Sequence, residues 1–305
     1  SPTYTLTAHP LSQSWDEGYG LDMHQYLDPG VDNSGEGATW NARTKGAVSQ
    51  GSLELDGGSD YFTAADHANF SFGDGTSDDP FSISAWIYID DTDDEQPIIS
   101  KWTDAKREYA LLVDSNGALT LRIFDESADA DVLVKTGNST IAEDTWYHVA
   151  ATYSGVAGSD AGAGVKLYVA GSSETVGVTN TNTYVAMEDL SQGVTVGTRK
   201  DVSAGSSTFF DGKVDEISVW GKELTAAEVT DLYNDGCPTD LRFHSVYKSS
   251  KSNLIAWWRF ETKDVETQDS ATTIKDHSIN SHDGTGTSLV AGSLSTSTPG
   301  ACANE

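Results

Sequence analysis

The stretch 212–233 constrains the fold of this chain most, because a strand pattern passes directly into a helix pattern. Apolar residues alternate in its first half between bounding glycines, although an acidic pair interrupts the period of two. In its second half, Thr225 and Glu228 have the spacing of a capping box, and Gly236 is placed to end the helix. The stretch therefore predicts one strand followed by one short, well-capped helix.

The rest of the chain has the pattern of many short strands joined by polar turns. The clearest strand is 81–89, in which Phe81, Ile83 and every second residue after them share one face. Asp114-Ser-Asn-Gly117 joins two further strands as a hairpin. Strands at this spacing without intervening helices predict an all-β, antiparallel sandwich with one short helix near 225–234.

The chain has 305 residues and a formal net charge of −29. Such an acidic surface repels nucleic acid and anionic membranes, which both depend on Lys and Arg for binding. No stretch approaches the roughly 18 consecutive apolar residues of a membrane span. The acidity suits a salty medium and supplies oxygen ligands for divalent cations, or it serves solubility alone.

The two cysteines, Cys237 and Cys302, both lie in the last quarter of the chain. They form either one disulfide, which requires an oxidising compartment, or two free thiols. The sequence begins at Ser1 without Met or a signal-like apolar run, so we expect a processed chain or part of a longer one.

Four motifs, in this order, resemble the laminin-G-like, concanavalin-A-type jelly-roll family. They are Phe-Ser-Ile-Ser-Ala-Trp-Ile at 81–87, Thr-Trp-Tyr-His-Val-Ala-Ala-Thr-Tyr at 145–153, Lys-Leu-Tyr-Val-Ala-Gly at 166–171 and the strand–helix stretch at 214–229. The resemblance covers about residues 50–236 and implies a jelly-roll β-sandwich.

The flanking segments divide the chain further. We expect 1–49 to be an N-terminal arm or the edge of a preceding β-module, and 237–305 to be an extension that adds a strand at 253–260 to the same sandwich. The motif Ala-Trp-Trp-Arg-Phe at 256–260 resembles the opening strand of the family, but here it follows the domain. Either the sandwich is circularly rearranged or a partial second repeat docks on it. The first is favoured, because about fifty residues cannot easily bury a sandwich of their own.

This order, together with Ser-Trp-Asp-Glu-Gly-Tyr-Gly-Leu-Asp at 14–22, is similar to surface and appendage proteins of marine tailed phages. The resemblance implies a non-catalytic structural or cell-adhesion module, such as a capsid-decoration or tail-appendage protein, on a virion or extracellular surface. Its expected partners are other surface proteins and cell-surface glycans, and self-association is left open. The alternative is a secreted glycoside hydrolase or its carbohydrate-binding module.

The family resemblance also implies a structural Ca²⁺. Asp215 of the last long strand takes the role of carboxylate ligand, and Asp56 and Gly57, with Asp60 nearby, take that of an early ligand-bearing turn. Turns rich in Asp and Gly supply the six to eight oxygens that Ca²⁺ prefers. The alternative is that the turn residues are ordinary and that Asp215 hydrogen-bonds a neighbouring loop.

No catalytic residues are predicted. Glu54 and Asp56 share one strand face, as a hydrolase acid pair requires, but a third acid is missing and the strand lies at the start of the domain. His148 lies within a strand, which favours a packed, hydrogen-bonded residue over a catalytic base.

Glycan binding is expected where aromatic rings stack on sugars and amides fix the hydroxyl groups. The candidates are Trp102 at a strand end, Tyr184 in a loop rich in Asn and Thr, and Asn180 and Asn182 beside it. The alternative for each aromatic ring is packing in the core or between the sheets.

Overall fold

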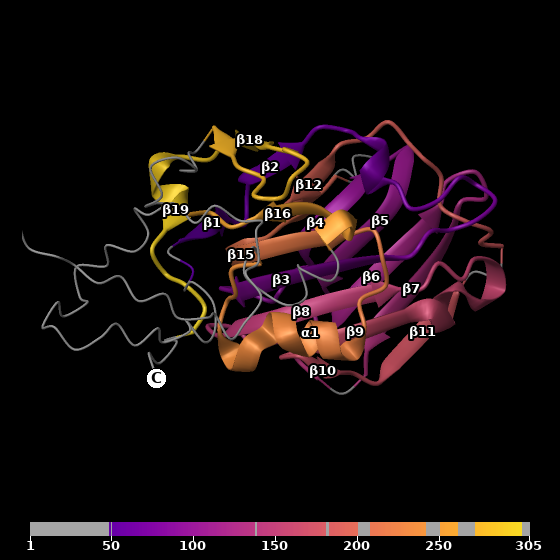
Figure 1. Ribbon diagram of the computed structural model, residues 1–305, viewed down its shortest axis with the longest axis horizontal. Coiled ribbons are helices and arrows are strands. Elements are labelled where there is room, and N and C mark those ends of the chain that lie inside the picture. The colour runs from indigo at the N-terminus through magenta and orange to yellow at the C-terminus, as the bar shows by residue number, and fades with distance from the viewer. Residues whose placement is uncertain are drawn as a thin grey trace, which may run out of the picture. The chain divides into compact units, whose positions relative to one another are not determined.

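The computed structural model describes residues 49, 51–137, 139–180, 183–200, 208–241, 251–261 and 272–300. Two large antiparallel sheets pack on one another with their apolar faces together (Figure 1). The predicted all-β sandwich with one short α-helix is therefore confirmed. The predicted arm at 1–49 lies almost entirely outside the described residues.

The first sheet has eight strands, and β15 lies near its middle. In spatial order its strands are β10 (Ser172–Ser173), β9 (Val165–Val169), β8 (Trp146–Tyr153), β3 (Phe81–Ile89), β15 (Asp211–Trp220), β1 (Ser52–Asp56) and β19 (Leu294–Ser295), and β16 (Leu254–Trp258) also pairs with β15.

The second sheet has nine strands. In spatial order they are β11 (Val176–Asn180), β7 (Ala130–Thr136), β6 (Leu119–Asp125), β5 (Lys106–Val113), β4 (Gln96–Thr103), β12 (Val194–Val196), β2 (Tyr61–Ala64), β18 (Gly284–Thr287) and β17 (Thr273–Ile274). A separate two-stranded ribbon joins β13 (Thr198–Arg199) to β14 (Thr208–Phe209).

The helical elements are short. They are α1 (Ala226–Tyr233) and the 3₁₀ turns η2 (Ala68–Phe70), η3 (Gly158–Gly164), η4 (Asn234–Gly236), η5 (Lys251–Asn253) and η6 (Ala291–Ser293). Among the described residues, none of the helices combines the length and the apolar character that crossing a membrane requires.

The core lies between the two sheets and follows the alternation seen in the sequence. Every second residue of β3, from Phe81 to Ile89, is buried in it. The intervening residues of β3 lie on the outer face of the eight-stranded sheet, because successive side chains of a strand point to opposite faces. This alternation decides which side chains are available for function.

The long strand β15 organises the eight-stranded sheet. It pairs with β3 along one edge, and along the other edge its first half pairs with β1 and its second half with β16. A bulge interrupts β15 between Asp215 and Ser218, and Glu216 within it has a positive φ of 48°. The strand expected at 253–260 is thus found as β16, directly beside β15.

Helix α1 covers part of the outer face of the eight-stranded sheet (Figure 1). The Thr225 side chain accepts from the Glu228 N–H and the Glu228 side chain accepts from the Thr225 N–H, which confirms the predicted capping box. Val229 and Leu232 pack with Trp220 of the sheet. The sequence predicted that Gly236 ends the helix. In the structure the helix ends instead at Asn234, which adopts the left-handed conformation.

Candidate functional site

The aromatic residues predicted to bind glycans are buried. Trp102 is 2% exposed, and its ring packs edge-on against Phe124 with ring centroids 5.2 Å apart. Tyr184 is also 2% exposed, and its hydroxyl donates to Asp78 Oδ2 at 2.6 Å. Neither ring has a free face for a sugar, so their prediction as stacking residues was wrong.

The two predicted asparagines add nothing to these buried rings. Asn180 Nδ2 donates to the backbone carbonyl of Ser159 at 2.9 Å, which ties β11 to the turn η3. Asn182 lies outside the described residues. The predicted glycan site around 180–184 is therefore not assembled by the part of the chain that the structure describes.

The predicted calcium ligands are not brought together. The register of β1 against β15 places Asp56 across from Asp211 and Leu53 across from Val214, so Asp215 lies several residues away along the sheet. Asp215 is also fully buried, whereas Asp56 is exposed. Within the described ranges, no group of three or more His, Cys, Asp or Glu side chains is placed to hold a metal ion.

The early turn is held by its own backbone. Asp56 Oδ1 accepts hydrogen bonds from the N–H groups of Gly58, Ser59 and Asp60 at 2.8–3.0 Å. Burial acts to raise the pKa of Asp56, but these hydrogen bonds outweigh it and lower the pKa. The role of Asp56, Gly57 and Asp60 as Ca²⁺ ligands stays a prediction.

Asp215 is buried next to Glu216, which belongs to an acidic cluster around Arg259. Arg259 Nε lies 3.2 Å from Glu216 Oε1, and the Trp257 indole donates to Glu216 Oε2 at 2.6 Å. Asp240 and Glu261 contact the remaining guanidinium nitrogens at 3.4 and 2.8 Å. Burial raises the pKa of Glu216 to about 7, against the opposing charge of Arg259.

His148 is packed, as expected from its position in a strand. Its Nε2 lies 2.8 Å from Ser84 Oγ, and burial lowers the pKa of the ring to about 3. It lines a cavity of about 10 Å³ together with Glu216 and Thr239. A space of this size holds at most a water molecule, so the cavity is no substrate pocket.

The arrangement best suited to binding is a transverse row of side chains on the outer face of the eight-stranded sheet, which we call the outer-face row. Pairing places Glu54 of β1 across from Lys213 of β15, Lys213 across from Tyr88 of β3, and Tyr88 across from Trp146 of β8. Directly opposed residues share one face of a sheet. The row therefore presents a carboxylate, an ammonium, a phenol and an indole in sequence.

The outer-face row is open to solvent. Glu54 is exposed, and the other three members are partly exposed. The Tyr88 and Trp146 ring centroids are 5.7 Å apart with the planes inclined by 58°, and Lys213 Nζ lies 4.6 Å from the Tyr88 centroid. Asp144 accepts from the Tyr88 hydroxyl at 3.1 Å, which brings a further carboxylate to the row.

The neighbouring row of the same face is buried, and the end of the helix packs against two of its three members. Asp215, Trp86 and His148 are opposed in register two residues further along the strands, and all three are buried. Tyr233, at the end of α1, stacks on Trp86 with ring centroids 6.0 Å apart. The helix therefore ends where the outer-face row begins.

Part of this site could be predicted from the sequence. Alternation in 81–89 and 146–153 places Tyr88 and Trp146 on faces opposite the core. What the sequence did not give is the register between strands that are distant in the chain. Without it, Glu54 and Lys213 could not be placed beside the two rings.

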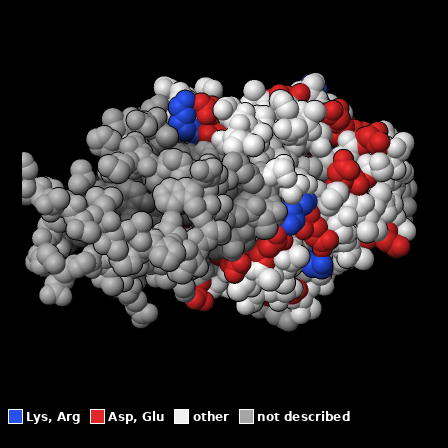
Figure 2. Space-filling view, viewed as in Figure 1, with Lys and Arg blue, Asp and Glu red and all other residues white. Residues whose placement is uncertain are grey.

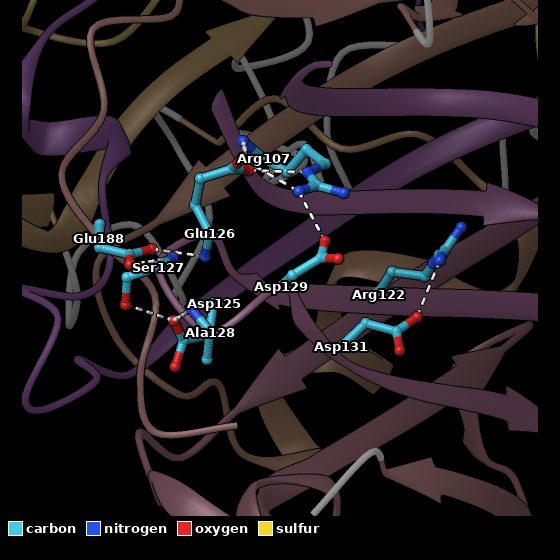
Figure 3. Close-up of polar contacts among 9 residues, drawn as sticks. All are labelled: Arg107, Arg122, Asp125, Glu126, Ser127, Ala128, Asp129, Asp131 and Glu188. Carbon is cyan, nitrogen blue, oxygen red and sulfur yellow. Dashed lines mark hydrogen bonds and ion pairs between the residues drawn. The ribbon is translucent and has the colours of Figure 1, made fainter. Parts of the chain in front are cut away.

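The outer face of the nine-stranded sheet has a different character (Figure 3). Arg107 lies 3.9 Å from the Phe124 ring centroid, and its guanidinium contacts Glu126 and Asp129 at 2.7–3.0 Å. Arg122 contacts Asp131 at 2.8 Å. Because these guanidinium groups lie over aromatic rings and are already ion-paired, the face is better suited to cross-linking its own strands than to holding a ligand.

Carboxylates also hold the nearby turn around 125–128, by accepting hydrogen bonds from backbone N–H groups. Glu188 accepts from the N–H groups of Glu126 and Ser127, both at 2.8 Å (Figure 3). Asp125 accepts from the Ala128 and Val185 N–H groups at 2.9 Å. Several carboxylates therefore serve as hydrogen-bond acceptors for loops. On the face that Figure 2 shows, acidic side chains still cover more of the described surface than basic ones.

Comparison with known proteins gives the family. The laminin-G family model described as "Concanavalin A-like lectin/glucanases superfamily" matches residues 56–230. No curated protein matches the chain.

Several solved structures are similar to this chain at low identity. A Bacteroides ovatus protein is 16% identical, with 80% of this chain and 61% of that one covered and a TM-score of 0.49. The carbohydrate-binding module CBM40 of a Ruminococcus gnavus sialidase, bound to sialyllactose, is 10% identical, with 62% and 98% covered and a TM-score of 0.43. A pentraxin of Limulus polyphemus is 18% identical, with 57% and 82% covered and a TM-score of 0.37. This chain thus spans less than two thirds of the Bacteroides protein.

The family model matches more than half of the chain. The chain therefore belongs to the concanavalin A-like lectin/glucanase superfamily.

Proposed function

We propose that this protein is a non-catalytic glycan-binding module for adhesion, and that its ligand lies along the outer-face row. The observation that carries the proposal is the in-register order Glu54, Lys213, Tyr88, Trp146 on an open sheet face. Three inter-strand steps of about 4.8 Å give the row a length of about 14 Å, enough for a short oligosaccharide rather than a single small ion.

The chemistry of the row suits sugars. A pyranose presents apolar C–H groups on its ring face, which stack on Trp146 or Tyr88, and hydroxyl groups at its edge. The carboxylates of Glu54 and Asp144 accept from those hydroxyl groups, and Lys213 donates to an oxygen. Aromatic and polar groups thus converge on one shallow surface.

The ligand should be neutral. One ammonium group, Lys213, lies among the carboxylates of Glu54, Asp90 and Asp144, and its distance to Asp90 is 3.7 Å. The chain as a whole has a net charge of −29. Sulfated or carboxylated glycans would therefore be repelled, whereas neutral hexose chains would not.

Hydrolysis is the second candidate, because the family includes glucanases. The acid pair that the sequence offers for hydrolysis is Glu54 and Asp56, which share one face of β1. The lowered pKa of Asp56 does not suit proton donation, and its Oδ1 already accepts hydrogen bonds from the backbone of its turn, which does not suit attack on a substrate. Reducing-sugar release that Glu54→Gln abolishes would establish the enzyme and overturn the binding proposal.

The test is binding of the full chain to a panel of neutral and sulfated oligosaccharides, followed by titration calorimetry on the strongest ligand. Trp146→Ala should weaken binding about tenfold or more, since stacking and buried area are lost together. Tyr61→Ala is the matched control. Its ring lies on the other sheet with Lys200 Nζ 4.4 Å from its centroid, which mimics the Lys213–Tyr88 pair.

The outcomes are distinct. Binding that is lost in Trp146→Ala and kept in Tyr61→Ala supports the outer-face row. Binding that survives Trp146→Ala, or that fails in Tyr61→Ala instead, places the ligand elsewhere. The role on a virion surface, expected from the sequence, stays a prediction.

A further inference from the structure

The edges of the two large sheets differ in length. The eight-stranded sheet ends in β10 and β19, which have two residues each, and the nine-stranded sheet ends on one side in β17, also of two residues. Two longer strands have one partner strand each. The outer side of β16 is hydrogen-bonded by the loop 276–280, since the Trp257 N–H donates to Asp276 and Asn280 Nδ2 donates to the Ile255 carbonyl. The other longer strand is β11, which has five residues, Val176–Asn180. Short edge strands protect a sheet against pairing with other chains, because they offer few free backbone groups. In the described part of the chain, β11 is therefore the large-sheet edge with neither form of protection.

The composition of β11 does not protect it either. Its residues Val-Gly-Val-Thr-Asn contain no charge and no proline, although the chain carries a net charge of −29. Charged side chains and proline are the usual means of blocking an edge. Three of the five strand residues are exposed, among them Val178 at 49%.

The surroundings of β11 are also apolar. Val178 contacts the turn η3, since a Cβ placed on Gly162 would lie 2.3 Å from Val178 Cγ1. Val156 precedes η3, and the Val185 carbonyl accepts from Gly158 at its start. Val156 and Val185 are 44% and 49% exposed, so three of the five exposed large apolar side chains among the described residues lie in or beside β11 and η3.

We propose that β11 pairs with β11 of a second copy of this chain, antiparallel and across a two-fold axis near Val178. Such pairing joins two nine-stranded sheets into one continuous sheet, in which the outward backbone groups around Val178 of each copy pair with those of the other. It also places the two Val178 side chains side by side on the same face. At Gly177, a Cβ would meet nothing within 4 Å, so the backbone there is open to approach.

Charge favours a second copy at this uncharged strand over a contact through the acidic parts of the surface. Two chains of −29 each repel one another, and a contact built on acidic surface would add further like-charge pairs. An uncharged strand adds none. The remaining long-range repulsion is screened by salt, so the dimer should strengthen as ionic strength rises.

The test is sedimentation velocity of the full chain at low and high salt, with Val178→Lys as the disrupting variant. We expect a monomer–dimer equilibrium that shifts toward dimer in high salt and a monomer at all salt concentrations for Val178→Lys. Val290→Lys is the matched control, because Val290 is 63% exposed and lies outside β11 and η3, and this variant should still dimerise.

A second variant tests the geometry. Val178→Cys should form an intermolecular disulfide under mild oxidation, because the two-fold axis brings both copies of position 178 together, whereas Val290→Cys should not. A wild-type chain that stays monomeric in high salt, or a dimer that survives Val178→Lys, overturns the proposal. Glycan binding is independent of it, since the outer-face row lies on the other sheet and should titrate unchanged in Val178→Lys.

Discussion

Lys213 lies directly across from Tyr88, and its Nζ is 4.6 Å from the centroid of the tyrosine ring. The same ammonium group lies 3.7 Å from Asp90. Ring and carboxylate together fix the lysine at the centre of the outer-face row, between Glu54 and the aromatic pair. A preorganised donor of this kind loses little conformational entropy when it meets a ligand.

Replacing Lys213 by Met should weaken binding of a neutral glycan severalfold, because the ammonium donor is lost while the apolar stem remains. The cation–π contact is worth about 0.5–1 kcal/mol at a site near the surface, so the free energy of unfolding should fall by no more than about that amount. Calorimetry and urea unfolding measure the two effects separately. A loss of stability of several kcal/mol would mean that Lys213 serves the fold rather than the ligand.

Replacing Arg259 by Met should strongly destabilise the fold. The substitution leaves Glu216, Asp240 and Glu261 buried without their cation, and removing one partner of a buried ion pair typically costs about 3–5 kcal/mol. The measurement is the free energy of unfolding in urea. The control is Arg107→Met, whose guanidinium is 23% exposed and should cost about 1 kcal/mol or less. If both variants lost the same free energy of unfolding, burial of the Arg259 cluster would not explain the loss.

Stability should fall as pH rises through the range from about 4.5 to 7. Burial raises the pKa of Glu216 to about 7 from a usual value of 4.5, so in this window the folded state binds more protons than the unfolded state. The free energy of unfolding must then decrease with rising pH. Above about pH 7 the contribution of Glu216 is constant.

Glu216→Gln should make this slope shallower, because one proton-binding group is removed from the folded state. The slope should not vanish, since burial raises the pKa of Asp215 as well and raises that of Glu108 to about 7. The measurement is Tm between pH 5 and 8, with Asp129→Asn as a control at a carboxylate that is 80% exposed. An unchanged slope in Glu216→Gln would contradict the assignment.

Replacing Thr225 by Ala should lower the free energy of unfolding by about 1 kcal/mol, the usual cost of losing an N-cap side chain. The variant removes the acceptor for the Glu228 N–H, and α1 then covers Trp220 and Leu232 less firmly. Thr225→Ser, which keeps the hydroxyl, should restore most of the loss. A Ser variant as unstable as the Ala variant would show that the methyl group matters instead of the cap.

Structural features that depend on residues close together in the sequence were predicted correctly. The capping box of α1 depends on residues three positions apart, and the buried face of β3 depends on a period of two. Both are local consequences of backbone geometry, so they can be derived without knowing what the elements pack against. The family motifs are local in the same sense, and the jelly-roll fold that they implied is the one found.

Burial of single aromatic residues was predicted less well. Trp102 lies at a strand end and Tyr184 in a loop, which suggested exposed rings, yet Arg122 and Arg199 lie over Trp102 while Asp78 binds Tyr184. Those partners come from elements far away in the chain. Exposure depends on them, so the sequence around each ring could not reveal it.

The sequence by itself determined the strands, the capped helix and the side chains that face away from the core. Only the tertiary structure decided that β15 pairs with β1, β3 and β16, and therefore that Glu54, Lys213, Tyr88 and Trp146 form one row while Asp215 is buried. The physical reason is that strand register between distant segments is set by the fit of the whole core, because a shift by one residue would turn every buried side chain of the strand toward solvent.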